Sequence, residues 1–164
     1  RFGKISPTKA SHVLDDYQGK VPVIDGGDCQ LGLESTILDL SQKLPSIRRL
    51  GIITKKDLLP FISEFGETET IAPGTMKAHY APSTALHLSE DLEQDKRVFE
   101  EKGLSVAILS IDNLEHYAKV LYAELRRLDQ LGVDVLIAKK PLQKGLGLAI
   151  SDRLNRASFG SLKD

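Results

Sequence analysis

The spacing of apolar residues is most regular in the second half of the chain. Short apolar runs alternate there with longer segments whose apolar residues recur every three or four positions, the signatures of buried strands and amphipathic helices. This pattern predicts strands at 85–88, 105–110 and 133–138, and helices at 91–102, 114–131 and 145–157. Alternating strands and helices are typical of a parallel sheet with right-handed crossovers. We therefore expect a small Rossmann-like domain with flanking helices over residues 84–164.

The first 65 residues have a less regular pattern, interrupted by glycine-rich turns. A helix is expected after the Ser-Pro-Thr string at 6–8, with Thr8 as its N-cap. The other apolar stretches predict strands at 21–24, 35–40 and 46–50 and a helix, capped by Thr54, at 54–62. These elements are typical of the end of an α/β or α+β sheet. The expected fold class is α/β, with part of a twisted-sheet domain ahead of the Rossmann-like parallel sheet.

Residues 66–83 separate the two patterned regions and show no periodicity. The string APGTMKAHYAP occupies positions 72–82, and its two prolines and one glycine argue against a helix or a central strand. It brings Lys77, His79 and Tyr80 close together on a loop, where binding and catalytic side chains are often found. We expect a linker between two folded parts. A structural alternative stays open, in which Tyr80 packs as an anchor and His79 bonds a backbone carbonyl.

The composition is that of a globular protein, with 41% hydrophobic and 27% charged residues. The net charge of -1 gives no sign of a nucleic-acid-binding field over the whole surface. Cys29 is the single cysteine, which excludes an internal disulfide, and no apolar run reaches the roughly 20 residues needed to cross a bilayer. We expect a cytoplasmic location and no membrane partner. The chain begins at Arg1 and not at Met, which suggests a fragment or a processed protein.

Three segments ahead of the linker carry side chains suited to ligand binding. Ser6 precedes a helix N-terminus, which attracts anions, although an ordinary helix cap is the simpler interpretation. Ser35 follows Glu34 at the entry of an expected strand, where its side chain points to one face only. Arg48 and Arg49 end the next strand, so one of them faces a cleft if the strand is regular. A guanidinium there suits a phosphate or a carboxylate, and a surface ion pair is the alternative.

Other polar residues have structural interpretations. The glycine-rich turn at 25–32 would allow a ligand to approach the backbone, but an ordinary loop is favoured. His79 has no acidic residue at ligand spacing, so we expect no metal site. Solvated helix faces are the expected positions of four arginines, Arg126, Arg127, Arg153 and Arg156.

Taken in order, these segments resemble the threonylcarbamoyl-AMP synthase family in its longer form. The matching strings are RFGKISPT, IDGGDCQLGLESTILDL, IRRLGIIT, APGTMKAHYAP, LYAELRRLDQLGVD and GLGLAISDRLNRAS. The resemblance implies the C-terminal part of a YrdC-like catalytic domain at 1–65, a linker with a HYAP motif at 66–83 and a Rossmann-like C-terminal domain at 84–164. Two motifs of the family, Lys-x-Arg and Ser-Ala-Asn, are absent from these 164 residues.

The resemblance implies a nucleotidyltransferase that makes threonylcarbamoyl-AMP from L-threonine, bicarbonate and ATP, with Mg²⁺ entering through the nucleotide. The product serves the threonylcarbamoyladenosine modification of tRNA, so tRNA-modification proteins are candidate partners and direct RNA binding stays open. Because two motifs are absent, we expect these residues alone to be inactive. The alternative is a regulatory module that binds RNA or protein.

The resemblance also implies roles for single residues, while no catalytic residue and no metal ligand is assigned. Leu50 stands where the family has a proline after the arginine that corresponds to Arg49, which loosens the turn. The implied site residues are Ser6, Arg49 and Tyr80 for ATP, Ser35 for L-threonine, and Lys77 and His79 for a linker gate.

Overall fold

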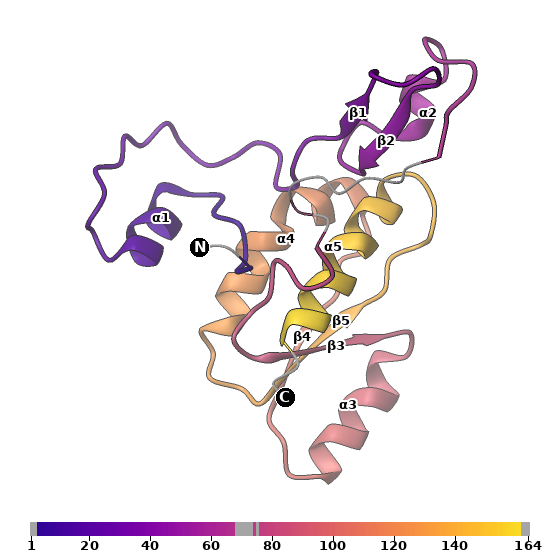
Figure 1. Ribbon diagram of the computed structural model, residues 1–164. Helices are drawn as coiled ribbons and strands as arrows, with labels where there is room; N and C mark the ends of the chain where they lie inside the picture. Colours follow the sequence, from indigo (N-terminus) through magenta and orange to yellow (C-terminus); the bar gives the residue numbers. More distant parts are fainter. Residues whose placement is uncertain (1–2, 68–73, 75, 162–164) are drawn as a thin grey trace.

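The computed structural model describes residues 3–67, 74 and 76–161. The strands of its second half are β3 (Ala85–Ser89), β4 (Val106–Leu109) and β5 (Val135–Lys139). They form one parallel sheet in the order β3-β5-β4 (Figure 1). The helices are α3 (Leu92–Glu101), α4 (Leu114–Asp129) and α5 (Leu146–Ser161). The expected alternation of strands and helices and the Rossmann-like parallel sheet are therefore confirmed.

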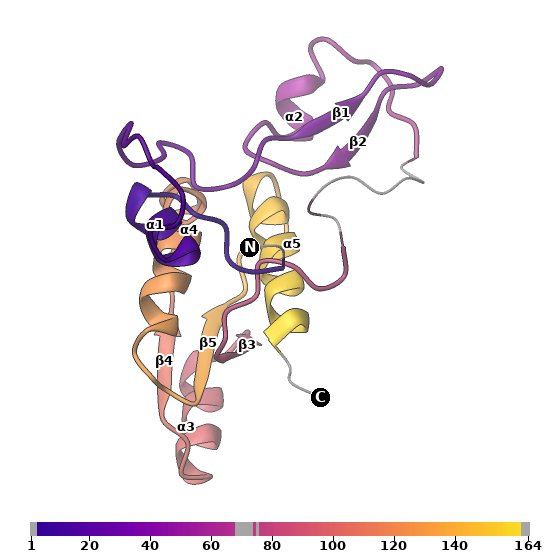
Figure 2. The ribbon, with the colours of Figure 1, turned by 60° about the vertical axis from the view of Figure 1, so that its left-hand side comes forward.

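The core of this region lies between the sheet and the pair α4 and α5. Helix α5 packs against α4 and β3, whereas α3 contacts β4 and β5 and lies apart from the other two helices (Figures 1 and 2). Helix α4 forms because its apolar residues recur on one stripe, which faces the core. The buried residues of that stripe are Tyr117, Ala118, Leu121, Tyr122, Leu125 and Leu128.

Side-chain caps fix where α3 and α4 begin. Asp91 accepts a hydrogen bond from the Gln94 amide at 3.1 Å, and Asn113 accepts one from the His116 amide at 2.8 Å. Each cap satisfies an amide that has no partner inside the helix. The first turn of both helices is therefore specified locally by the sequence.

The first part of the chain contains short elements. These are helix α1 (Ala10–Tyr17), an antiparallel hairpin of β1 (Ile37–Asp39) and β2 (Ser46–Arg49), and helix α2 (Lys55–Leu58). The hairpin and α2 lie beyond one end of α5 (Figures 1 and 2). Helix α2 begins as predicted, with a capping box between Thr54 and Asp57. It ends before the expected position because Pro60 has no amide hydrogen to continue the helix.

Two expectations for this region are wrong. The run at 21–24 forms no strand, and Ile24 is 98% exposed. No strand within the described ranges pairs with this run, and a single extended segment leaves its backbone groups without a ladder. Thr8 is not the N-cap of α1, because the helix begins at Ala10; the Thr8 amide donates to His12 Nδ1 at 3.1 Å. The cap position falls on Lys9, which makes no side-chain cap hydrogen bond.

The glycine-rich turn at 25–32 has the features of an ordinary loop. Asp25 accepts a hydrogen bond from the Gly27 amide at 2.8 Å, which closes a local turn. Gly27 has a φ of 90°, a conformation that favours glycine. These features support the loop interpretation of the turn.

The described part of the linker joins the two regions. Lys4 and Ala81 form a parallel bridge, and the Ala81 amide donates to the Gly3 carbonyl at 2.9 Å. Three linker positions discussed above, Ala72, Pro73 and Thr75, lie outside the described residues. Within the described ranges, the helices are too short or too polar to cross a membrane.

Candidate functional site

The carboxylate of Glu34 lies where three segments of the chain meet. Ser6 Oγ donates to one of its oxygens at 2.7 Å. The other oxygen accepts from Tyr122 Oη at 2.8 Å and from Arg153 Nε at 2.9 Å. Burial alone would raise the pKa of Glu34, but hydrogen bonds from Arg153, Ser6 and Tyr122 outweigh burial and lower the pKa. Glu34 is therefore ionised at neutral pH and connects the N-terminal segment to α4 and α5.

Glu34 gives the fold a defined acid sensitivity. Because its folded pKa lies below the ordinary value of 4.5, ionised Glu34 stabilises the fold above that pH. This contribution is lost as the pH falls through the folded pKa. We expect the midpoint of thermal unfolding to fall as the medium is acidified below pH 4.5, and to fall less steeply in Glu34→Gln. Calorimetry over that range measures both slopes, and equal slopes would contradict the assignment.

Arg153 is fully buried, which corrects the expectation of a solvated helix face. Besides Glu34, its guanidinium binds the Asp152 carboxylate through Nη1 at 2.6 Å and the Leu50 carbonyl through Nη2 at 2.7 Å. Its carbon Cζ lies 5.5 Å from the centroid of the Tyr80 ring, within cation–π range. Burial would lower the pKa of Arg153, but the neighbouring acidic groups raise it, so the side chain keeps its charge.

Arg126 also differs from expectation, whereas Arg127 agrees with it. Arg126 forms a bidentate ion pair with Asp16 of α1 at 2.7 and 3.0 Å and donates to the Ile5 carbonyl at 2.5 Å. It therefore fastens α1 and the N-terminal segment to α4. Arg127 is 58% exposed and pairs with Glu124 one turn earlier on the same helix.

Ser35 and Arg49, both predicted to bind substrate, lie in contact. Arg49 Nη2 donates to Ser35 Oγ at 3.2 Å, and Arg49 Nε donates to the Ser35 carbonyl at 3.0 Å. Arg48 instead forms an ion pair with Asp39. Hydrogen bonds from Ser41 and from Arg48 lower the pKa of Asp39 to about 2. The two arginines therefore have different surroundings: Arg48 forms a largely buried ion pair, with the side chains of Arg48 and Asp39 16% and 14% exposed, and Arg49 contacts Ser35.

Tyr80 is held inside the protein in a strained conformation. It is 1% exposed, and its φ of 61° lies in a region that non-glycine residues rarely adopt. Its ring lies 5.3 Å from that of Tyr122 and 4.1 Å from that of His79, measured between centroids. The hydroxyl donates to the Gly74 carbonyl at 3.4 Å, and burial raises its pKa. These contacts match the structural alternative for Tyr80, that of an anchor.

His79 and Lys77 contact α5. The His79 amide donates to the Arg156 carbonyl at 3.3 Å, and burial lowers the pKa of the His79 ring. Arg156 was expected on a solvated face, but it donates to the Met76 carbonyl at 2.6 Å and its side chain is 20% exposed. Lys77 Nζ lies 4.2 Å from the centroid of the Phe159 ring. The linker segment around His79 is therefore attached to α5.

The predicted site residues other than Lys77 are connected to one another through Tyr80 and its neighbours. A Cβ built on Gly74 would lie 2.1 Å from Tyr80 Oη and 3.3 Å from Arg49 Nη1, so this linker glycine links Tyr80 to the pair of Arg49 and Ser35. Ser6 and Tyr122 both donate hydrogen bonds to Glu34, and the ring of Tyr122 stacks on that of Tyr80, which connects Ser6 to Tyr80. Lys77 instead packs on Phe159 of α5.

Three residues of this cluster, Glu34, Tyr122 and Arg153, were not predicted as site residues. A signal for Arg153 is present in the sequence, because Ile150, Leu154 and Ala157 share its helix face at apolar spacing. A charged residue on a core-facing stripe is almost never fully buried unless it is paired. Tyr122 lies on the buried stripe of α4, where its hydroxyl needs a hydrogen-bond partner. Glu34 adjoins Ser35 and gives no periodic signal.

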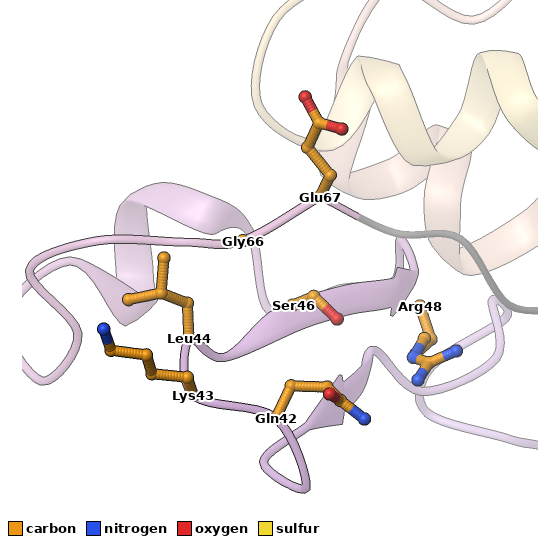
Figure 3. Close-up of a pocket in the computed structure, with 7 residues that line it drawn as sticks. All are labelled: Gln42, Lys43, Leu44, Ser46, Arg48, Gly66 and Glu67. Carbon is orange, nitrogen blue, oxygen red and sulfur yellow. The ribbon is translucent and has the colours of Figure 1, made fainter.

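A cavity of about 410 Å³ lies beside the hairpin (Figure 3). Ser46 and Arg48 reach it from β2, and Gly66 and Glu67 from the chain after α2 (Figure 3). Arg49 and Ser35 do not line it, so this cavity belongs to the Arg48 side of the strand. Among the described residues, no group of three or more His, Cys, Asp and Glu side chains could hold a metal ion.

The arrangement places the guanidinium of Arg49, the hydroxyls of Ser6 and Ser35 and the partly buried carboxylate of Glu34 at the junction between the hairpin, the linker and α5. Comparison with known proteins defines the class. The family model for the C-terminal domain of threonylcarbamoyl-AMP synthase matches residues 42–158. The chain therefore belongs to the threonylcarbamoyl-AMP synthase family, as the C-terminal portion of that architecture.

Individual relatives agree with this assignment. The threonylcarbamoyl-AMP synthase of Pyrococcus abyssi is 34% identical over 95% of this chain, and that of Bacillus subtilis is 31% identical over 96%. The solved structure of P. abyssi Sua5 complexed with L-threonine superposes with a TM-score of 0.83 at 33% identity, covering 98% of this chain and 56% of that one. A solved P. abyssi variant has a consecutive histidine and tyrosine replaced by alanine; its TM-score is 0.81, its identity 31%, and it covers 97% of this chain and 55% of that one. The chain spans 55% of the length of each of the two curated relatives.

Proposed function

We propose that this chain is the C-terminal part of an enzyme that makes threonylcarbamoyl-AMP from L-threonine, bicarbonate and ATP. The enzyme would be a nucleotidyltransferase, and its product would serve the threonylcarbamoyladenosine modification of tRNA. The contact between Arg49 and Ser35 carries the proposal, because it sets a candidate phosphate ligand beside a candidate threonine ligand. The P. abyssi structure with L-threonine supports it, since that relative binds the amino acid that the reaction uses.

In this proposal Ser35 binds L-threonine and Arg49 binds the phosphates of ATP. Ser6 keeps lone pairs on its oxygen for the nucleotide while its hydrogen is donated to Glu34. Tyr80 contacts the nucleotide from the linker, and Lys77 and His79 gate the site. The domain limits that we propose are 1–65 for the catalytic part, 66–83 for the linker and 84–164 for the Rossmann-like domain.

The chemistry requires stabilisation of charge and protection from water. Transfer of the adenylyl group to the carbamate breaks the bond between the α- and β-phosphates, and negative charge develops on the leaving pyrophosphate. The guanidinium of Arg49 would stabilise that charge electrostatically. In this proposal Mg²⁺ enters with ATP, bound to its phosphates. A linker closed over the site would shield the labile carbamate from water.

The proposal is tested by release of pyrophosphate from ATP. We expect the full-length protein that contains these residues to release it only when L-threonine and bicarbonate are both present. The 164 residues alone are expected to release none, because they lack the Lys-x-Arg and Ser-Ala-Asn motifs. An inactive full-length protein would contradict the proposal and favour the binding-module alternative. Activity of the 164 residues alone would contradict the need for the missing motifs.

A further inference from the structure

We propose that Arg153 of α5 is a positioning residue, through which the C-terminal region holds Ser35 and Arg49 in place. This inference rests on the proposed function, because it concerns the same site. Among the hydrogen bonds and ring contacts of the described residues, Arg153 makes none with the side chain of Ser35 or Arg49. It binds the residue before Ser35, which is Glu34, and the residue after Arg49, which is Leu50.

The contacts of Arg153 with Glu34 and Leu50 lie at the end of the hairpin that carries Ser35 and Arg49. Glu34 and Ser35 lie ahead of β1, and Arg49 is the last residue of β2, so both substrate candidates lie at the same end of the hairpin. Arg153 Nε holds the first chain segment through Glu34 at 2.9 Å, and Nη2 holds the second through the Leu50 carbonyl at 2.7 Å. One guanidinium therefore spans the two chain segments that present the candidate ligands.

Only arginine can make this set of contacts. Each of its three nitrogens has an acceptor, since Nη1 binds Asp152 at 2.6 Å, and the group also lies over the ring of Tyr80. A lysine has one ammonium group without a planar fork, so it can keep the ion pair with Glu34 but cannot also reach Leu50 and cover the ring. Because Arg153 is fully buried on a packed helix, its position is set by the C-terminal core.

The ion pair of Glu34 and Arg153 also connects to Ser6 and Tyr80, the other two candidate ATP ligands. Glu34, held by Arg153, accepts the hydrogen bond from Ser6, and Tyr80 stacks on Tyr122, whose hydroxyl also donates to Glu34. Every ATP or threonine candidate is thus one or two contacts from Arg153. The C-terminal region would contribute geometry to the reaction, although it supplies no reacting group.

The test uses the full-length protein that contains these residues, with Arg153→Lys and the matched control Arg127→Lys on the exposed face of α4. We expect Arg153→Lys to lower kcat/KM for L-threonine by about tenfold to a hundredfold, because small displacements of positioned groups cost that much. The KM for L-threonine should rise, whereas Arg127→Lys should match the wild type. A folded Arg153→Lys protein with unchanged kcat and KM would overturn the proposal.

Amide hydrogen exchange separates this proposal from the proposed function. In Arg153→Lys, we expect faster exchange at 34–37 and 49–51 and unchanged exchange in the sheet of β3, β4 and β5. If the wild type releases no pyrophosphate, the proposed function falls and this exchange pattern decides the positioning role alone. Unchanged exchange at the hairpin would overturn it.

A second variant covers failure of Arg153→Lys to fold. Glu34→Gln combined with Arg153→Met removes both charges of the ion pair, so that no buried charge is left without its partner, and we expect it to fold with a raised KM for L-threonine. Failure of both variants to fold would also overturn the proposal, because it would leave Arg153 a purely structural role.

Discussion

Replacement of Glu34 by alanine will lower the free energy of unfolding by about 3–5 kcal/mol at neutral pH, the range seen when one partner of a buried ion pair is removed. The cause is the fully buried guanidinium of Arg153, which loses the carboxylate at its Nε and keeps only that of Asp152 at Nη1. Ser6 and Tyr122 lose their shared acceptor in the same variant. Urea denaturation followed by circular dichroism measures the change.

Glu124→Ala is the matched control for this prediction. Glu124 also pairs with an arginine, Arg127, but this pair lies on the surface of α4 with the arginine side chain 58% exposed. Exposed ion pairs contribute at most about 1 kcal/mol. If Glu34→Ala and Glu124→Ala cost the same free energy, Glu34 does not have the buried role assigned to it.

Replacement of Tyr80 by alanine is expected to cost a similar amount, about 3–5 kcal/mol, as for other buried aromatic residues truncated to alanine. The ring packs between His79 and Tyr122 and under Arg153, so its loss leaves a cavity where the linker meets α5. Alanine keeps the Cβ that makes a φ of 61° unfavourable, so the replacement does not relieve the backbone strain. The same denaturation assay reports the loss.

Tyr80→Phe keeps the ring and removes the hydroxyl. Its hydrogen bond to the Gly74 carbonyl is long, at 3.4 Å, so the expected cost is at most about 1 kcal/mol. A loss in Tyr80→Phe as large as in Tyr80→Ala would show that the hydroxyl, and not the stacked ring, anchors the linker.

The second half of the chain could be predicted from its sequence because its signals are local and repeated. The run VLIAK in β5 is apolar and flanked by strands on both sides, and α4 shows a regular buried stripe. The run at 21–24 has the same local composition as a strand but no partner within the described residues. A strand depends on its neighbours, which a local pattern does not reveal.

The candidate site was predictable only where a local sequence pattern indicates the position of a side chain. Alternation along β2 predicts that one of Arg48 and Arg49 faces a cleft, and the structure places Arg48 at the cavity beside the hairpin, whereas Arg49 contacts Ser35. The pairing of Glu34 with Arg153 joins residues 119 positions apart in the sequence. No local pattern predicts such a contact, although a charged residue on the buried stripe of α5 indicates that Arg153 needs a partner.

Helix α5 is proposed to hold Ser35 and Arg49, the candidate substrate ligands, through Glu34 and Arg153. A double-mutant cycle on kcat/KM for L-threonine in the full-length protein, with Glu34→Gln, Arg153→Met and their combination, tests it most directly. We expect strong coupling, so that the double variant loses little more than the worse single variant. Losses that simply multiply in the double variant would contradict it, because the two residues would then act independently.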